Sequence, residues 1–241
     1  MVNNHIASAF DRDLDKIQAQ IMKMGGLVET AIRDAATAYE LRDLDLAAKV
    51  RANDKTIDQI EETINDECSK LIALRAPTAI DLRLVLSVFK VSSNLERIGD
   101  YAKNMAKRTI VLEGLANSHD RRLGLKRLAR EVELMLKDAL DAYVNRDLDL
   151  ARDVIARDMD IDQMYNALFR EFLTYMMEDP RNITPCMHLH FMAKNLERMG
   201  DHVTTIAEQV VFLVTGQRDE DERDKGDMTS SDPEMSKTSK G

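Results

Sequence analysis

The sequence contains no tryptophan, only 5% aromatic residues, nine glycines and four prolines. Strands are enriched in aromatic and β-branched residues, and glycine and proline mark the turns between them. Their scarcity argues against a β-rich protein and favours long helices with few interruptions. Hydrophobic residues make up 44% of the 241 positions, which is ordinary for a globular protein. We therefore predict an all-α fold.

Cysteine and long apolar runs are scarce as well. Cys68 and Cys186 form no C-x-x-C motif and no cysteine–histidine cluster. Isolated cysteines of this kind are typical of reduced thiols in the cytosol, so we expect a cytoplasmic protein. The apolar run Val210–Val214 is far shorter than the about 20 residues that span a bilayer. A membrane connection is therefore expected only indirectly, through a partner.

Basic residues are outnumbered. The sequence has 34 Lys and Arg residues and 43 Asp and Glu residues, which gives a formal net charge of −9. A protein that binds nucleic acid needs a basic surface to displace phosphate counterions, so we predict no nucleic-acid partner. The basic stretch Asp120–Arg130 is interpreted as a solvated helix face.

The chain repeats two phrases in the same order. N-L-E-R-I-G-D at Asn94–Asp100 recurs as N-L-E-R-M-G-D at Asn195–Asp201, and the offset from 94 to 195 is 101 residues. R-D-L-D-L-A at Arg42–Ala47 recurs at Arg146–Ala151, and the offset from 42 to 146 is 104 residues. Nearly equal offsets indicate a tandem duplication with a small length change between the copies. The duplicated unit is therefore expected to set the fold.

Each copy reads as three helices. Apolar residues recur at helical spacing, and the pattern breaks at Arg42-Asp43, at Arg146-Asp147 and at the prolines. The predicted helices cover about 6–40, 44–75, 79–113, 120–144, 148–178 and 184–215, and Gly216 is the predicted C-cap of the last one. Three amphipathic helices with short connections close into an antiparallel bundle. The sequence thus predicts two tandem three-helix bundles.

The predicted domains follow from these helices. Residues 1–115 form the first bundle and residues 116–216 form the second. Residues 217–241 lack an apolar period and are rich in Asp, Glu, Ser, Lys and Gly, so we predict a disordered acidic tail.

Each copy also carries two acidic pairs with a spacing of four residues, which places both carboxylates on one helix face. The first copy has Asp54 with Asp58 and Glu96 with Asp100, and the second has Asp158 with Asp162 and Glu197 with Asp201. Carboxylates that converge between two helices raise each other's pKa, and a multivalent cation removes that cost by taking their oxygens as ligands. These eight residues are our candidate metal ligands.

Two further features bear on these pairs. Gly99 and Gly200 lie beside them in the middle of predicted helices, where glycine costs about 1 kcal/mol relative to alanine. Close helix approach or space for an ion would explain both glycines. Arg97 and Arg198 precede Asp100 and Asp201 by three residues, so a salt-bridged helix surface remains the alternative to a metal site.

Other catalytic patterns are missing from the sequence. There is no glycine-rich phosphate loop, no H-E-x-x-H motif and no Glu-x-x-His motif of the di-iron bundles. His188 and His190 are two residues apart and point to different helix faces, which argues against a zinc site. The methionine-rich stretch is interpreted as adaptable core, and it comprises Met176, Met177, Met187, Met192 and Met199. We predict a protein that is not an enzyme.

Asp81-Leu82-Arg83 leads into the first L-E-R-I-G-D phrase, and the second copy repeats the phrase as L-E-R-M-G-D. With these motifs, residues 6–216 resemble the PhoU family of bacterial phosphate-signalling accessory proteins. The resemblance implies a cytoplasmic, homodimeric negative regulator of the phosphate-starvation response. Such a protein links a Pst-type phosphate ABC transporter to a sensor histidine kinase and restrains phosphate uptake.

The resemblance also implies a multinuclear metal at the eight acidic residues, with iron, zinc, manganese and magnesium all open. One departure concerns the second copy, which has Tyr165 and Asn166 where the first has Glu61 and Glu62. We therefore expect the two sites to differ in ligand count or occupancy. The alternative function is a metal-dependent enzyme or a metal store that uses the same carboxylates.

Overall fold

The protein is represented by a computed structural model that describes residues 2–115 and 122–217. These residues form six α-helices and one short 3₁₀ turn, and no strand is found among them. The helices are α1 (Val2–Leu41), α2 (Leu44–Arg75), α3 (Ala79–Glu113), α4 (Arg122–Asn145), α5 (Leu148–Glu178) and α6 (Ile183–Thr215), and the turn is η1 (Pro180–Asn182). The all-α prediction is confirmed.

The predicted helix boundaries agree closely with these elements, except that α1 begins several residues earlier than expected. The tail predicted for residues 217–241 lies outside the described residues beyond Gln217. The predicted boundary between residues 115 and 116 falls at the edge of the second undescribed stretch.

The repeated R-D-L-D-L-A phrase forms the turn before α2 and before α5. Arg42 and Arg146 adopt the left-handed conformation, with φ angles of 56° and 54°. The next residue in each copy is the N-cap, because the Asp43 carboxylate accepts a hydrogen bond from the Leu46 amide and Asp147 does the same for Leu150. The duplicated sequence therefore specifies the same sharp helix–helix turn twice.

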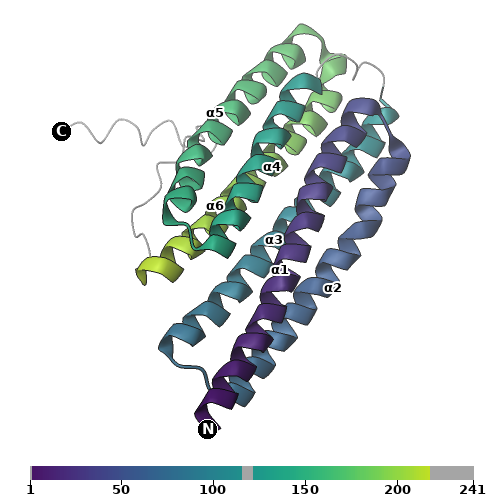
Figure 1. Ribbon diagram of the computed structural model, residues 1–241. Coiled ribbons are helices and arrows are strands. Elements are labelled where there is room, and N and C mark those ends of the chain that lie inside the picture. The colour runs from purple at the N-terminus through teal and green to yellow at the C-terminus, as the bar shows by residue number, and fades with distance from the viewer. Residues whose placement is uncertain (1, 116–121, 218–241) are drawn as a thin grey trace, which may run out of the picture.

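The six helices form two three-helix bundles that lie side by side (Figure 1). Helices α1, α2 and α3 pack on one another, as do α4, α5 and α6, and the bundles meet where α3 contacts α6 and α1 contacts α4. The buried apolar side chains of both bundles belong to one continuous core. The two copies therefore pack against each other and share one core.

Contacts along the α3–α6 seam show that these two helices run antiparallel. His202 of α6 lies 2.7 Å from the Asn94 side chain, measured from Nδ1 to Oδ1. Toward the end of α3, Arg108 lies 3.3 Å from the His188 ring nitrogen, whereas Arg83 at its start lies over the Phe212 ring. Residue numbers that increase along α3 thus lie opposite residue numbers that decrease along α6. Because α3 and α6 are equivalent helices, the copies are related by an approximate two-fold rotation.

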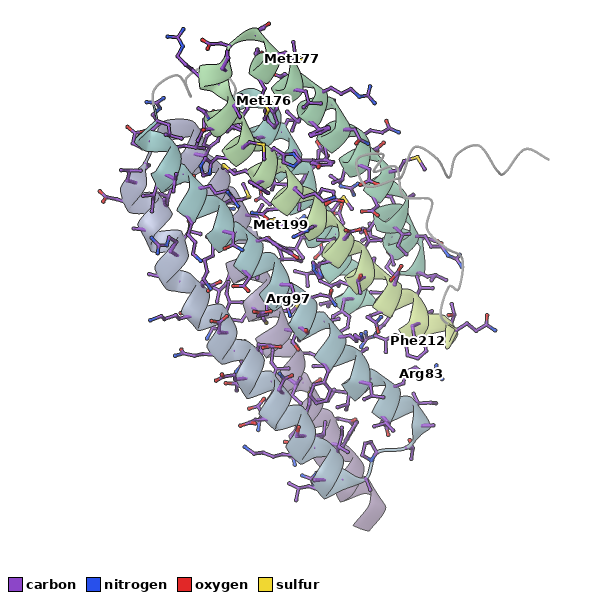
Figure 2. The ribbon with its side chains drawn as sticks, turned by 180° about the vertical axis from the view of Figure 1, so that it is seen from behind. Arg83, Arg97, Met176, Met177, Met199 and Phe212 are labelled. Atoms are coloured by element: carbon purple, nitrogen blue, oxygen red, sulfur yellow. The ribbon has the colours of Figure 1, made fainter. Side chains whose placement is uncertain are left out.

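The methionine-rich stretch is only partly core. Met192 and Met199 are fully buried on α6. Met177 is 80% exposed and Met187 is also exposed, so the prediction that they fill the core is wrong. Met177 lies at the end of α5 and Met187 near the start of α6, and Figure 2 shows Met177 at this end of the second bundle.

None of the described helices has a stretch long and apolar enough to cross a bilayer.

Candidate functional site

The structure brings the predicted acidic residues together in two groups, one in each bundle. We call Asp54, Asp58, Glu96 and Asp100 the first cluster and Asp158, Asp162, Glu197 and Asp201 the second cluster. In the first cluster, Asp54 and Asp58 come from α2 and face Glu96 and Asp100 of α3. The helical spacing of four residues therefore produces the predicted convergence between two packed helices.

Gly99 and Gly200 allow the helices of each pair to approach closely. A Cβ atom on Gly99 would lie 3.1 Å from Ile57 Cδ1, and one on Gly200 would lie 3.2 Å from Ile161 Cγ2. The same Cβ atoms would lie 3.8 Å from Asp54 Oδ1 and 3.6 Å from Asp158 Oδ1. Each glycine thus lets one buried isoleucine and one cluster aspartate pack against bare backbone, as the duplicated phrase predicts.

The carboxylates of the first cluster repel one another. Burial raises the pKa of Asp58, and the negative charge of Asp54 raises it further. Burial likewise raises the pKa of Glu96, with a second contribution from Asp100. Lys103 opposes the shift at Asp58. The first cluster is therefore a place where positive charge is stabilising.

The sequence analysis missed the residue that supplies this positive charge. Lys103, one helical turn after Asp100 on α3, forms an ion pair with Asp54 and another with Asp100, the latter at 2.9 Å from Nζ to Oδ1. Hydrogen bonds to these two carboxylates raise the pKa of the Lys103 ammonium. The sequence carried a signal for this residue. The equivalent position of the second copy is Thr204, so the charge of Lys103 is a difference between the two copies.

Asp54 is the most buried member of the first cluster. The residue is 3% exposed, and its Oδ2 atom contacts Lys103. Its other carboxylate oxygen, Oδ1, is buried and has no hydrogen-bond partner among the described residues. A buried carboxylate oxygen without a donor is costly, and a cation is one way of satisfying it.

The second cluster is arranged differently. Here Asp162 and Glu197 are the buried members, and Lys194 of α6 pairs with Glu197 at 2.8 Å from Nζ to Oε1. Lys194 also lies over the ring of Tyr165 at 4.9 Å from the centroid. Lysine therefore approaches the two clusters at different positions, since Lys194 corresponds to Ser93 in the first copy.

The clusters fit a hard metal ion by donor chemistry, because all eight side chains offer carboxylate oxygens. Asp54 Oδ1 is one such oxygen, and no donor among the described residues satisfies it. Within residues 2–115 and 122–217, however, no three His, Cys, Asp or Glu side chains are close enough together to hold an ion as they stand. Binding would require the carboxylates to turn inward and the lysine of each cluster to be accommodated.

Ion pairs on the helix surface, the alternative to a metal site, are also present. They differ from the Arg97–Asp100 pair that the spacing suggested. Arg97 lies 3.7 Å from Glu96, measured from Nε to Oε2, whereas the ion-pair partner of Asp100 is Lys103. Arg97 is exposed and lies near the middle of the α3–α6 seam (Figure 2). A contact between sequence neighbours, one of which is exposed, contributes little stability.

Comparison with known proteins gives consistent results. The family model described as "PhoU domain" matches residues 21–109 and again residues 125–210, which are the two copies. A phosphate-specific transport system accessory protein PhoU homologue from Rhizobium meliloti is 45% identical over 230 residues, covering 95% of this chain and 97% of the relative. A homologue of the same name from Caulobacter vibrioides is 42% identical and covers 95% of this chain and 100% of the relative.

Solved structures share the fold. The crystal structure of PhoU from Pseudomonas aeruginosa matches with a TM-score of 0.83 and 40% identity, covering 86% of this chain and 100% of that one. The phosphate transport system regulatory protein PhoU from Streptococcus pneumoniae matches with a TM-score of 0.80 and 29% identity, covering 87% of this chain and 98% of that one. These names describe accessory and regulatory proteins rather than enzymes.

Proposed function

Since the chain belongs to the PhoU domain family, we propose that it is a negative regulator of the phosphate-starvation response. Its family membership makes it an accessory protein of phosphate transport and confirms the prediction that it is not an enzyme. In the proposed role, it links a Pst-type phosphate ABC transporter to a sensor histidine kinase and restrains phosphate uptake. It acts as a homodimer in the cytoplasm and reaches the membrane only through these partners.

The observation that carries this proposal is the family match over both copies of the duplicated unit. It is supported by relatives of nearly full length whose names place them in a phosphate-specific transport system. A protein that transmits a signal between two partners needs surfaces rather than a catalytic pocket, and the sequence carries none of the catalytic motifs considered above. When phosphate is plentiful, the adaptor holds the kinase in the state that leaves its response regulator inactive.

A phosphate-starvation reporter tests this role. Alkaline phosphatase would be measured in cells that lack the protein and grow in abundant phosphate. We expect high output, which returns to the low level when the intact chain is supplied. Low output in the deleted cells would contradict the proposed negative regulation.

The proposal includes a metal at the two clusters, either iron, zinc, manganese or magnesium. Two matched double variants test it: Glu96→Ala with Asp100→Ala in the first cluster, and Glu197→Ala with Asp201→Ala in the second. We expect elemental analysis to show less bound metal for at least one of them, with helix content unchanged by circular dichroism. Unchanged metal content in both would remove the metal from the proposal.

A further inference from the structure

The arginine of the duplicated N-L-E-R-x-G-D phrase is exposed in both copies. The Arg97 side chain is 61% exposed, and Arg198 is exposed as well. The antiparallel register of the α3–α6 seam, with Asn94 opposite His202, places the two arginines across the seam from each other. Burial lowers the pKa of His202 against the opposing charge of Asp201. The charges of Arg97 and Arg198 lower it further, so both arginines lie near this ring.

On α3, Arg97 belongs to a line of basic residues. Arg83, Lys90 and Arg97 are seven residues apart, or about two helical turns, so they follow one helix face at intervals of about 10.5 Å. Lys90 is exposed, and Leu86 between it and Arg83 is 51% exposed. The line continues at the same spacing through Asn104 and without an acidic residue.

A second line with the same spacing lies on α6 and comprises Phe191, Arg198, Thr205 and Phe212. Arg83 lies over the Phe212 ring at 5.2 Å from the centroid, and Arg108 lies over the Phe191 ring at 4.4 Å. Figure 2 shows Arg83 and Phe212 at one end of the seam and Arg97 near its middle. We define the seam strip as Arg83, Lys90, Arg97, Arg108, Phe191 and Arg198.

The charge of the seam strip is opposite to that of the protein. All of its members except Phe191 are basic, whereas the chain carries a formal net charge of −9. The first cluster lies between α2 and α3 and the second between α5 and α6, so carboxylates flank the strip on both sides (Figure 2). A broad anionic surface such as a membrane would meet these carboxylates, whereas a single helix about 10–12 Å wide fits between them.

We propose that the seam strip docks one acidic amphipathic helix of a partner protein. Carboxylates seven residues apart on that helix pair with the basic line of α3, and its apolar side chains cover Leu86 and Phe191. Leu86 is 51% exposed and Phe191 is 43% exposed, so both have apolar surface to bury. The inference rests on the proposed adaptor function and adds the surface and the chemistry of the partner.

The test uses the purified full-length chain and two fluorescently labelled synthetic helices of about 21 residues, or three heptads. Both carry leucine on one face, and one carries glutamate at the flanking positions where the other carries lysine. Fluorescence anisotropy measures binding. We expect the glutamate peptide to bind at least about tenfold more tightly than the lysine peptide, and added salt to weaken it. Attraction by net charge alone gives the opposite preference, because the protein is acidic.

Three double variants make the result specific. Arg97→Glu with Arg198→Glu should reverse the preference in favour of the lysine peptide. Arg97→Gln with Arg198→Gln removes the two charges more gently and should weaken glutamate-peptide binding at least about tenfold, if the first variant folds poorly. Arg51→Glu with Arg152→Glu is the matched control, because both are exposed, on α2 and α5, and the net charge changes equally. It should keep the wild-type preference.

Several outcomes would overturn the inference: a wild-type preference for the lysine peptide, equal binding of both peptides, or the same reversal in the Arg51 and Arg152 control. So would binding of phosphatidylglycerol vesicles that is lost in the Arg97 and Arg198 variants while the glutamate peptide does not bind. Analytical ultracentrifugation that shows these variants losing a dimer, again without peptide binding, would assign the strip to a second copy instead.

The peptide measurement is independent of the reporter, so the two proposals can fail separately. Reversal of the peptide preference together with low reporter output in deleted cells would support the docking strip and contradict negative regulation. High reporter output in deleted cells without a preference for the glutamate peptide would support negative regulation and overturn the docking strip.

Discussion

The two cysteines show how burial controls chemistry at a single residue. The two cysteines are not joined in a disulfide, and both are fully buried in the helical core. Burial raises the pKa of the Cys68 thiol to about 12, and the negative charge of Glu67 adds to the shift. Because the thiolate is the reactive form, a thiol with such a pKa is almost entirely protonated at neutral pH.

We therefore predict that neither cysteine reacts with Ellman's reagent at pH 8 in the folded protein. Both should react within minutes once the chain is unfolded in guanidinium, because unfolding removes the burial. Absorbance of the released thiolate measures the number of reactive thiols. Rapid modification of one thiol in the native protein would contradict this, and Cys68→Ala would identify which residue reacts.

Residue-level prediction from the sequence succeeded where the feature is local. The spacing of Asp54 and Asp58, and of Glu96 and Asp100, places each pair on one helix face whatever surrounds it. The position of Lys103 between Asp54 and Asp100 depends on how α2 packs on α3, which the spacing on either helix does not specify. The Arg97–Asp100 pair of the alternative interpretation is not the pairing found, since Lys103 provides Asp100 with a less exposed partner.

At the scale of helices, α1 and α4 meet through charged side chains. Arg33 of α1 and Arg130 of α4 both pair with Glu133, at 3.4 Å and 3.2 Å from the guanidinium nitrogen. Glu29 lies one turn before Arg33, and burial, followed by the negative charges of Glu133 and Asp141, raises its pKa. The seam therefore disfavours the ionised form of Glu29.

The sign of the pH effect follows from that shift. A carboxyl group whose pKa is higher in the folded than in the unfolded chain binds its proton more tightly when folded. The free energy of unfolding therefore falls as the pH rises through the window that begins near the unfolded value of about 4.3. The contribution of Glu29 to the free energy of unfolding is therefore more favourable below this window than at neutral pH.

We predict that Glu29→Gln increases the free energy of unfolding at pH 7 by a few tenths of a kcal/mol, a typical size for like-charge pairs on helices. The gain should shrink as the pH falls through the unfolded value of about 4.3, because Glu29 then becomes protonated in both states. Urea denaturation at several pH values measures this. Asp11→Asn, at an exposed position on the same helix, is the control. A loss of stability at pH 7 would contradict the account.

Helix boundaries were predictable because their signals lie within a few residues of each end. Asp43 and Asp147 cap α2 and α5 directly after a left-handed arginine, and Gly216 ends α6 with a φ of 77°. Met177 and Met187 show what such patterns miss. Their apolar character favours burial, but both are exposed near the α5–α6 junction, and exposure depends on the packing of the whole molecule.

At the scale of the whole molecule, the α3–α6 seam holds the two copies together. Asn94 is buried there and its side-chain oxygen lies 2.7 Å from His202 Nδ1, while the His202 ring lies 5.7 Å from the ring of Tyr101. The repeat predicted two similar bundles but gave no information on their docking. Asn94 and His202 are not equivalent positions of the repeat, so duplication alone does not pair them.

A double-mutant cycle measures this contact. We predict that Asn94→Ala and His202→Ala each lower the free energy of unfolding by about 1–3 kcal/mol, the cost of leaving a buried polar group unpaired. The double variant should lose less than the sum of the two, with a coupling of about 1 kcal/mol. Urea denaturation of the three variants and the wild type provides the values. Strict additivity would mean that the two side chains do not interact.

In the proposed function, the protein acts as an adaptor through the sensor kinase. The most direct test is to delete the kinase gene in cells that already lack this protein and to measure alkaline phosphatase in abundant phosphate. We predict that output is high in the single deletion and returns to a low level in the double deletion, because the unrestrained kinase is what activates the response. Output that stays high without the kinase would contradict the adaptor role.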